Sequence, residues 1–169
     1  MPDHRYKKLA DLLVNHSCKV KPGEKVLIEA TDIPVEFTVE LIRSVDSVGG
    51  LPVVSTYHQS VLRALYQTAS NDQMAFIASI EKARMEGVQC YIGVRGSHNI
   101  SELSDVSSER MAIYEKHWWH EVHSEVRVKK TRWVVLRWPT YSMAQAAGMS
   151  LEAFQDFYFD VDRKSTRLN

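Results

Sequence analysis

The feature that most constrains the fold is a pair of strand-like segments joined by a single helix. Residues 25–30 form a short, mostly apolar run with β-branched side chains, which is typical of a strand covered on both faces. Pro34 suits the first turn of a helix, and Gly49-Gly50 marks its end. Residues 51–57 have the composition of a second strand. This order predicts a right-handed crossover unit with parallel strands.

The sequence of the connecting helix predicts its cap and its buried face. Thr31 and Asp32 are side chains of the kind that cap a helix amino terminus. Apolar residues spaced by three and four positions predict the face that packs on the sheet, namely Val35, Val39, Ile42 and Val45.

The alternation of helices and strands continues along the chain. An apolar stripe predicts a first helix over residues 6–16, and further helices are predicted over 60–68, 71–85 and from 105 to about 123. Residues 88–94 and 131–136 have the character of a third and a fourth strand. The sequence therefore predicts one open α/β domain with a mainly parallel sheet flanked by helices.

Length, charge and cysteine content narrow the class of protein. The 169 residues suit one domain, and 21 basic residues balance 21 acidic ones, which gives no electrostatic reason to expect nucleic acid or a membrane as partner. No run reaches the roughly 18–20 apolar residues of a membrane span, and the amino terminus lacks a secretory signal. Cys18 and Cys90 form no metal or disulfide motif. We therefore expect a cytoplasmic protein with reduced, buried thiols.

The most conspicuous candidates for metal binding are three histidines, His117, His120 and His123. Their spacing of three differs from the i and i+4 pair of a zincin helix. No nearby Cys or Asp supplies a clear further ligand. We interpret them as histidines at the rim of an aromatic packing surface and assign no metal ligand.

Three segments lie at the carboxyl ends of predicted strands: the loop over residues 31–34, the end of the second strand over residues 55–58 and the loop over residues 95–99. Ligands gather at this edge of open parallel sheets. The loops are therefore expected to line either a shallow pocket or a face that packs on another domain. The single glycine of the third loop does not make a phosphate-binding motif, so an ordinary turn is favoured there.

A nucleophilic triad can be written from Ser97, His58 and Asp32, one residue from each loop. No Gly-x-Ser-x-Gly elbow supports such a triad. We therefore name no catalytic residue in these loops.

Aromatic residues are concentrated near the end of the chain. A predicted strand over residues 131–136 is followed by two short helical patterns, separated by Gly148-Met149-Ser150. We expect some of the aromatic side chains to face a partner domain or subunit; they are Trp133, Trp138, Tyr141, Phe154, Phe157, Tyr158 and Phe159. Residues 161–169 are basic with little apolar pattern, so neither the end of a helix nor a new domain is expected there.

Four segments carry a resemblance to a known family: VKPGEKVLI at 20–28, RWVVLRWPT at 132–140, MAQAAGMS at 143–150 and FQDFYFD at 154–160. In this order they resemble the amino-terminal domain of the aminopeptidase T and aminopeptidase S family of metallo-aminopeptidases. The resemblance covers nearly all of residues 6–161. Tyr141 stands where that family is expected to have proline, and residues 163–169 do not resemble its continuation.

The resemblance implies a two-domain homodimeric enzyme that removes amino-terminal residues from peptides with two divalent metal ions, such as zinc, cobalt, magnesium or manganese. In that family the carboxylate and histidine ligands lie in the carboxy-terminal domain. No catalytic, cofactor-binding or metal residue is therefore assigned here. We expect residues 1–161 to be the amino-terminal domain and residues 162–169 a foreign tail, with the metal-binding domain absent.

On this view the chain is a fragment that is inactive alone, and its parent binds peptide through the missing domain. The alternative hypothesis is a stand-alone α/β binding or interaction module with no enzymatic activity. A third hypothesis is a small enzyme that uses His58 or His98 in the loops at the sheet edge.

Overall fold

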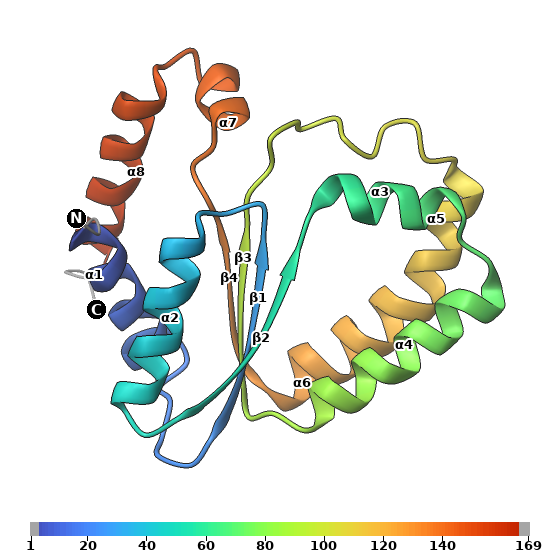
Figure 1. Ribbon diagram of the computed structural model, residues 1–169, viewed down its shortest axis with the longest axis horizontal. Helices are drawn as coiled ribbons and strands as arrows, with labels where there is room; N and C mark the ends of the chain where they lie inside the picture. Colours follow the sequence, from blue (N-terminus) through green and yellow to red (C-terminus); the bar gives the residue numbers. More distant parts are fainter. Residues whose placement is uncertain (1–3, 166–169) are drawn as a thin grey trace.

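The protein folds around a four-stranded sheet in which every strand is parallel to its neighbours (Figure 1). The structure is a computed structural model that describes the backbone of residues 4–165 and the side chains of residues 4–160. The strands lie in the order β2-β1-β3-β4 and comprise β1 Lys25–Thr31, β2 Leu51–Tyr57, β3 Cys90–Arg95 and β4 Arg132–Arg137. The predicted open, mainly parallel α/β fold is confirmed.

Helices cover both faces of this sheet, as a parallel sheet requires. On one face lie α1 (His4–Leu12), the π-helical turn η1 (Leu13–Ser17), α2 (Val35–Ser47) and α8 (Leu151–Ser165), drawn to the left in Figure 1. On the other lie α4 (Asn71–Glu86), α5 (Ser108–Tyr114), η2 (Glu115–Arg127) and α6 (Val128–Lys130). The short α3 (Gln59–Gln67) lies beyond the carboxyl end of β2, and α7 (Tyr141–Ala146) follows β4.

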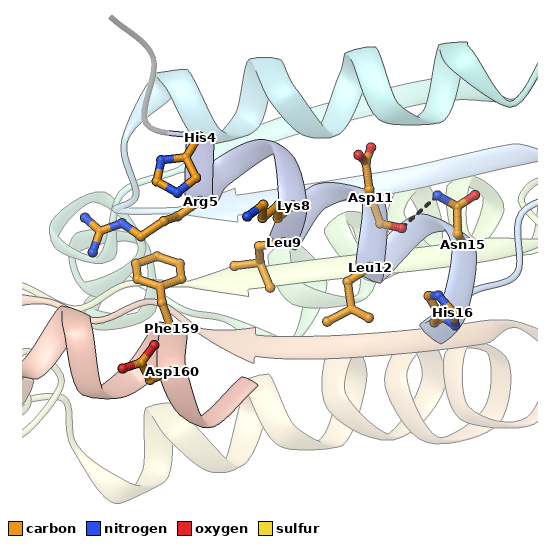
Figure 2. A pocket seen from close by; sticks show the side chains of 10 residues that line it. All are labelled: His4, Arg5, Lys8, Leu9, Asp11, Leu12, Asn15, His16, Phe159 and Asp160. Atoms are coloured by element: carbon orange, nitrogen blue, oxygen red, sulfur yellow. Dashed lines mark hydrogen bonds between the residues drawn. The ribbon is translucent and has the colours of Figure 1, made fainter. Parts of the chain in front are cut away.

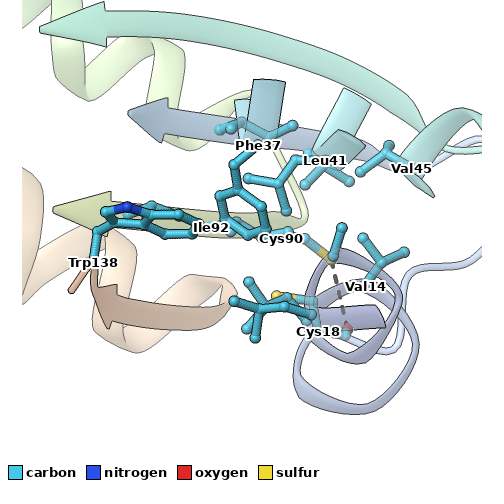
Figure 3. Packing of buried hydrophobic residues seen from close by; sticks show 14 of the residues in the cluster. Val14, Cys18, Phe37, Leu41, Val45, Cys90, Ile92 and Trp138 are labelled. Carbon is cyan, nitrogen blue, oxygen red and sulfur yellow. Dashed lines mark hydrogen bonds between the residues drawn. The ribbon is translucent and has the colours of Figure 1, made fainter. Parts of the chain in front are cut away.

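Strand alternation divides the core into two clusters. Even-numbered residues such as Val26, Ile28 and Ile92 pack against α1, η1 and α2 in the larger cluster, part of which is shown in Figure 3. Odd-numbered residues such as Leu27 and Tyr91 pack against α4 and η2 in the smaller one. Since successive strand residues point to opposite faces, one sheet holds both clusters together.

The predicted buried face of α2 is wrong in part. Val35 is 71% exposed, whereas Phe37, Leu41 and Val45 are fully buried. The reason is aromatic packing, because the Phe37 ring lies 4.6 Å from the ring of Trp138, which comes from the end of β4. This contact turns the helix so that the Phe37 side, rather than the Val35 side, meets the sheet.

The predicted cap of α2 is also wrong. The residue at the helix start is Pro34, and no side chain caps the first turn. Thr31 ends β1 instead. Asp32 has a positive φ of 46° and accepts hydrogen bonds from the loop after β2, as described below.

The helix predicted from residue 105 to about 123 starts later and runs further. Its regular part is α5, which continues into η2, a π-helix of 13 residues. The N–H of Val128 donates to the carbonyl of His123, five residues earlier. A π-helix has a wider turn than an α-helix, so its inward side chains recur at spacings of four and five, and buried Val122 and Arg127 lie on the same side.

The two predicted short helices near the end of the chain are α7 and α8. α8 runs on to Ser165, so the expectation that residues 161–165 do not finish a helix is wrong; residues 166–169 lie outside the described part. Of the terminal aromatics, Trp138 and Phe159 are buried and Tyr141 and Phe157 are exposed. A partner for the exposed ones stays a prediction.

Two further expectations can be compared with the structure. Cys18 and Cys90 are both free and buried, in agreement with the sequence analysis. Within residues 4–165, every helix is too short or too polar to cross a bilayer.

Phe37→Ala tests the corrected packing of α2. Removing a fully buried aromatic ring is expected to lower the free energy of unfolding by about 3–5 kcal/mol. Val35→Ala, the matched control on the same helix, is expected to change it by less than about 0.5 kcal/mol because Val35 is exposed. Urea denaturation measures both, and a larger loss for Val35→Ala would restore the face expected from the sequence.

Candidate functional site

The three loops expected at one edge of the sheet do meet there. Thr31 at the end of β1 is in register with Tyr57 at the end of β2 and with Arg95 at the end of β3. The residues that follow these strands therefore lie side by side, which confirms the expectation from parallel pairing.

The structure assembles two of the three residues of the hypothetical triad. The Nδ1 atom of His58 lies 3.0 Å from the Oδ1 atom of Asp32, and the Gln59 backbone N–H donates to Oδ2 of Asp32 over 2.8 Å. The hydroxyl of Ser97 instead donates to Gln59 Oε1 and to the Asn99 carbonyl. Among the described residues, no hydrogen bond joins Ser97 to His58, so this arrangement links the loops and does not activate a nucleophile.

Gly96 in the third loop is required by close packing. A Cβ atom at this position would lie 2.1 Å from the carbonyl oxygen of Asp32, which no larger residue tolerates. Its N–H donates to the Thr31 carbonyl over 2.7 Å. The glycine therefore lets the β3 loop dock on the β1 loop, in agreement with an ordinary turn.

The three histidines of η2 have three separate partners. His117 bonds Asn71 over 2.9 Å, and His120 lies 3.6 Å from Glu121. The guanidinium of Arg127 donates to Nδ1 of His123 over 3.1 Å. Among residues 4–160, no group of three or more His, Cys, Asp and Glu side chains is arranged to hold a metal ion.

One hollow of the surface is a groove of about 450 Å³ between α1 and the end of α8 (Figure 2). Its lining mixes the charges of Lys8 and Asp11 with the ring of Phe159. Asp11 is already engaged, since its Oδ2 accepts from Lys7 and its Oδ1 from Ser44. Asp160 lies at one end of the groove.

The stronger candidate is a cavity of about 340 Å³ on the opposite face of the sheet, enclosed by α3, α4, α5 and η2. We call it the α3 cavity. Its floor consists of Glu29, Thr31, Tyr57 and Arg95, which are the last inward side chains of three neighbouring strands. This face is apolar toward the start of the strands and polar toward their carboxyl ends. The helices pack on the apolar part and leave a polar hollow over the carboxyl ends.

A buried ion pair forms the centre of the α3 cavity. Glu29 is 8% exposed and Arg127 is fully buried, and Nη2 of Arg127 lies 3.5 Å from Oε2 of Glu29. The hydroxyl of Tyr91 donates to the same Oε2 over 2.6 Å. The Arg127 guanidinium also lies 3.9 Å above the Tyr91 ring, a cation–π contact that partly replaces lost hydration.

Tyr91 reaches Glu29 only because the residue between them is glycine. Glu29 is in register with Gly93, and a Cβ atom on Gly93 would lie 2.7 Å from the Tyr91 hydroxyl oxygen. The tyrosine ring therefore lies flat over Gly93 and directs its hydroxyl along the sheet.

Two polar atoms of this centre lack a protein partner. Among the described residues, neither Oε1 of Glu29 nor Nε of Arg127 makes a hydrogen bond. A buried charged group with an unused donor or acceptor is costly. The buried centre beside the α3 cavity therefore holds one acceptor and one donor without a protein partner.

Aromatic rings form the wall of the α3 cavity. The Tyr66 and Tyr114 rings lie 4.6 Å apart, and Tyr114 stacks on Trp118 at 5.5 Å. Burial raises the pKa of both Tyr66 and Tyr114, so both phenols stay neutral. The wall is therefore aromatic and uncharged.

The pKa values of Glu81 and His123 are both shifted toward the neutral form. Burial raises the pKa of Glu81, although the Arg84 charge opposes that shift. Burial, together with the charges of Arg127 and Arg95, lowers the pKa of His123. Arg127 can only donate, so Nδ1 of His123 accepts and the imidazole is the neutral form with its proton on Nε2.

The residues at the centre of this cavity are not evident from the sequence. Glu29 belongs to a mostly apolar strand, and Arg127 lies beyond the predicted end of its helix. A signal was present, because a carboxylate inside a strand covered on both faces must be paired. Its partner is 98 positions away, so no local pattern identifies it.

The fold and this cavity define an open parallel α/β domain with a candidate ligand site on one face of its sheet. Residues 2–167 match the family described as thermophilic metalloprotease (M29), and the chain belongs to that family. The resemblance drawn from the sequence is thereby confirmed. A search of curated proteins finds no match.

Solved structures support the same fold. Wild-type AmpT from Thermus thermophilus matches with a TM-score of 0.69 at 17% sequence identity, over 92% of this chain and 42% of that one. CurK enoyl reductase matches with a TM-score of 0.35 at 12% identity, over 97% of this chain and 49% of that one, which is too low to bear on the fold. The chain thus spans less than half the length of AmpT.

Membership of a metalloprotease family implies a divalent metal ion, but the described side chains do not fit one. His117 and His120 contact different residues on the protein surface. The Nδ1 lone pair of His123 is occupied by Arg127. A hydrolytic metal site needs several such ligands converging on one point, so no step of metal chemistry is assigned to residues 4–160.

Arg127→Met tests the buried ion pair. Removing one partner leaves the Glu29 carboxylate buried and unpaired, which is expected to cost about 3–5 kcal/mol of unfolding free energy. Adding Glu29→Gln removes that charge, so the double variant is expected to be more stable than Arg127→Met alone.

Urea denaturation of the four proteins in this cycle measures the coupling. Arg43→Met is the control, because the Arg43–Glu40 pair on α2 leaves the arginine 66% exposed and is expected to contribute less than about 1 kcal/mol. Losses that simply add in the double variant would show that Glu29 and Arg127 are independent.

The lowered pKa of His123 predicts a loss of stability in mild acid. The unfolded chain, with a histidine pKa near 6.5, takes up a proton before the folded chain does, so unfolding free energy falls below about pH 6.5. His123→Asn keeps an acceptor for Arg127 but does not titrate. It is expected to lose less stability than wild type between about pH 7 and pH 5.

His120→Asn is the control for this experiment, since His120 is 62% exposed. Urea midpoints at several pH values are compared for the three proteins. Equal slopes for His123→Asn and wild type would contradict the assigned neutral imidazole.

Proposed function

We propose that this chain is the amino-terminal α/β part of a metallo-aminopeptidase and that it does not hydrolyse peptides by itself. The observation that carries the proposal is the match of residues 2–167 to the thermophilic metalloprotease family. The fold shared with AmpT over 42% of that protein's length supports it. The separate partners of His117, His120 and His123 in the described part agree with a scaffold role.

Several finer statements belong to the same proposal. The metal ions would be zinc, cobalt, magnesium or manganese, held by carboxylates and histidines outside the described residues. Peptide substrate would bind through that same metal-bearing part, and the whole enzyme would act as a cytoplasmic homodimer. The exposed Tyr141 and Phe157 offer apolar surface for such contacts.

The proposal is tested by assaying the purified chain on leucine 4-nitroanilide with zinc, cobalt, magnesium or manganese present in separate reactions. No release of nitroaniline above the metal-only blank is expected, because two-metal hydrolysis needs converging ligands. Metal-dependent release that is abolished by a chelator and persists through repeated purification would refute the scaffold role.

A further inference from the structure

The α3 cavity has the size, the charge and the polar floor of a small-molecule site. Its volume of about 340 Å³ falls within the range of ligand pockets, roughly 300–1,000 Å³. Its floor is polar and its wall is aromatic, which is the composition that orients a ligand with one charged end. The family membership assigns nothing to it.

Among the described charged side chains at the cavity, the carboxylates form ion pairs and one arginine does not. Glu29 pairs with Arg127, and Glu81 pairs with Arg84 over 3.0 Å. The guanidinium of Arg95 has no hydrogen-bond or ion-pair partner among the described side chains, although its charge acts on Tyr66, Tyr114 and His123. One unpaired guanidinium beside two carboxylates favours a ligand with a single negative charge and disfavours a phosphate dianion.

The positions of Arg95 and Glu29 set the size of the ligand. Arg95 is in register with Thr31, and Glu29 is in register with Gly93. The two residues therefore lie on adjacent strands and two positions apart, which separates their Cα atoms by about 8 Å. Arg95 is exposed whereas Glu29 is buried, so Arg95 marks the entrance and Glu29 the inner end.

We propose that the α3 cavity binds a small monocarboxylate with an aromatic body. Its carboxylate pairs with Arg95 at the entrance, and its ring packs against Tyr66, Tyr114 and Trp118. A hydrogen-bond donor on the same molecule, such as an amide N–H, lies beside the Glu29 carboxylate at the inner end of the cavity. One ligand thereby pairs the unpartnered cation and brings a donor to the inner carboxylate.

N-acetyl-L-phenylalanine is a suitable probe because it combines a carboxylate, an amide N–H and a phenyl ring. It has no free amino group, so an aminopeptidase does not accept it as a substrate. Binding is measured by titration calorimetry in the presence of a chelator. The outcome is therefore independent of metal-dependent hydrolysis and of the function proposed above.

Saturable binding at one site per chain is expected, and the uncharged N-acetyl-L-phenylalaninamide is expected to bind about tenfold more weakly or worse, since it lacks the charge-assisted contact. Inorganic phosphate at the same concentrations is expected not to compete. No detectable binding of the acid at up to about 10 mM, or equal binding of the acid and the amide, would overturn the proposal.

Arg95→Gln locates the site, and it is expected to weaken binding of the acid about tenfold or more while leaving the weak binding of the amide unchanged. Arg95→Lys keeps the charge and is expected to retain part of the affinity. Arg43→Gln on the other face of the sheet is the control and is expected to bind as wild type does.

Thermal unfolding of each variant verifies that it folds, and Arg95 is exposed enough for its substitution to be tolerated. Wild-type affinity for the acid in folded Arg95→Gln would overturn the assignment of the carboxylate contact.

Discussion

The structure depends on one constraint, that a fully parallel sheet must be covered on both faces. On the face under α1, α2 and α8, apolar strand residues such as Val26, Ile28 and Ile92 are buried by the helices. The opposite face is apolar only toward the start of the strands, where Leu27 and Tyr91 pack on α4 and η2. Toward the carboxyl ends of the strands, the charged residues Glu29 and Arg95 point to that face, so apolar side chains do not pack closely on it. Arg127 from η2 packs over Glu29 instead, and the α3 cavity is the space that remains.

A buried ion pair of this kind is a weak source of stability, because desolvation of both charges offsets most of their attraction. The surroundings of Arg127 reduce that penalty through the Tyr91 ring and the neutral His123. They do not remove it, since one oxygen of Glu29 and one nitrogen of Arg127 keep unused bonding capacity. The π-helical turn of η2 brings Val122 and Arg127 to the same side. Single-turn π-bulges are often found at functional sites, and the longer π-helix η2 lines the α3 cavity.

The two proposals for this member of the thermophilic metalloprotease family are separable. A hydrolytic metal site needs converging ligands, and among the described residues the histidines of η2 contact three different residues, Asn71, Glu121 and Arg127. The proposed recognition of a small anion rests on the α3 cavity alone.

The sequence by itself determined the order of the elements and the parallel topology, because periodicity, proline and glycine act over a few residues, and a strand–helix–strand unit has one favoured hand. It also placed the ends of three strands at one edge, as Thr31, Tyr57 and Arg95 show. The buried side of α2 depends on the tertiary structure, because the Phe37 ring packs on Trp138, which follows a strand distant in the sequence. The partner of Glu29 depends on the tertiary structure as well. Burial makes that carboxylate require a cation, but which cation reaches it depends on how η2 packs over the sheet, and packing is a property of the folded chain as a whole.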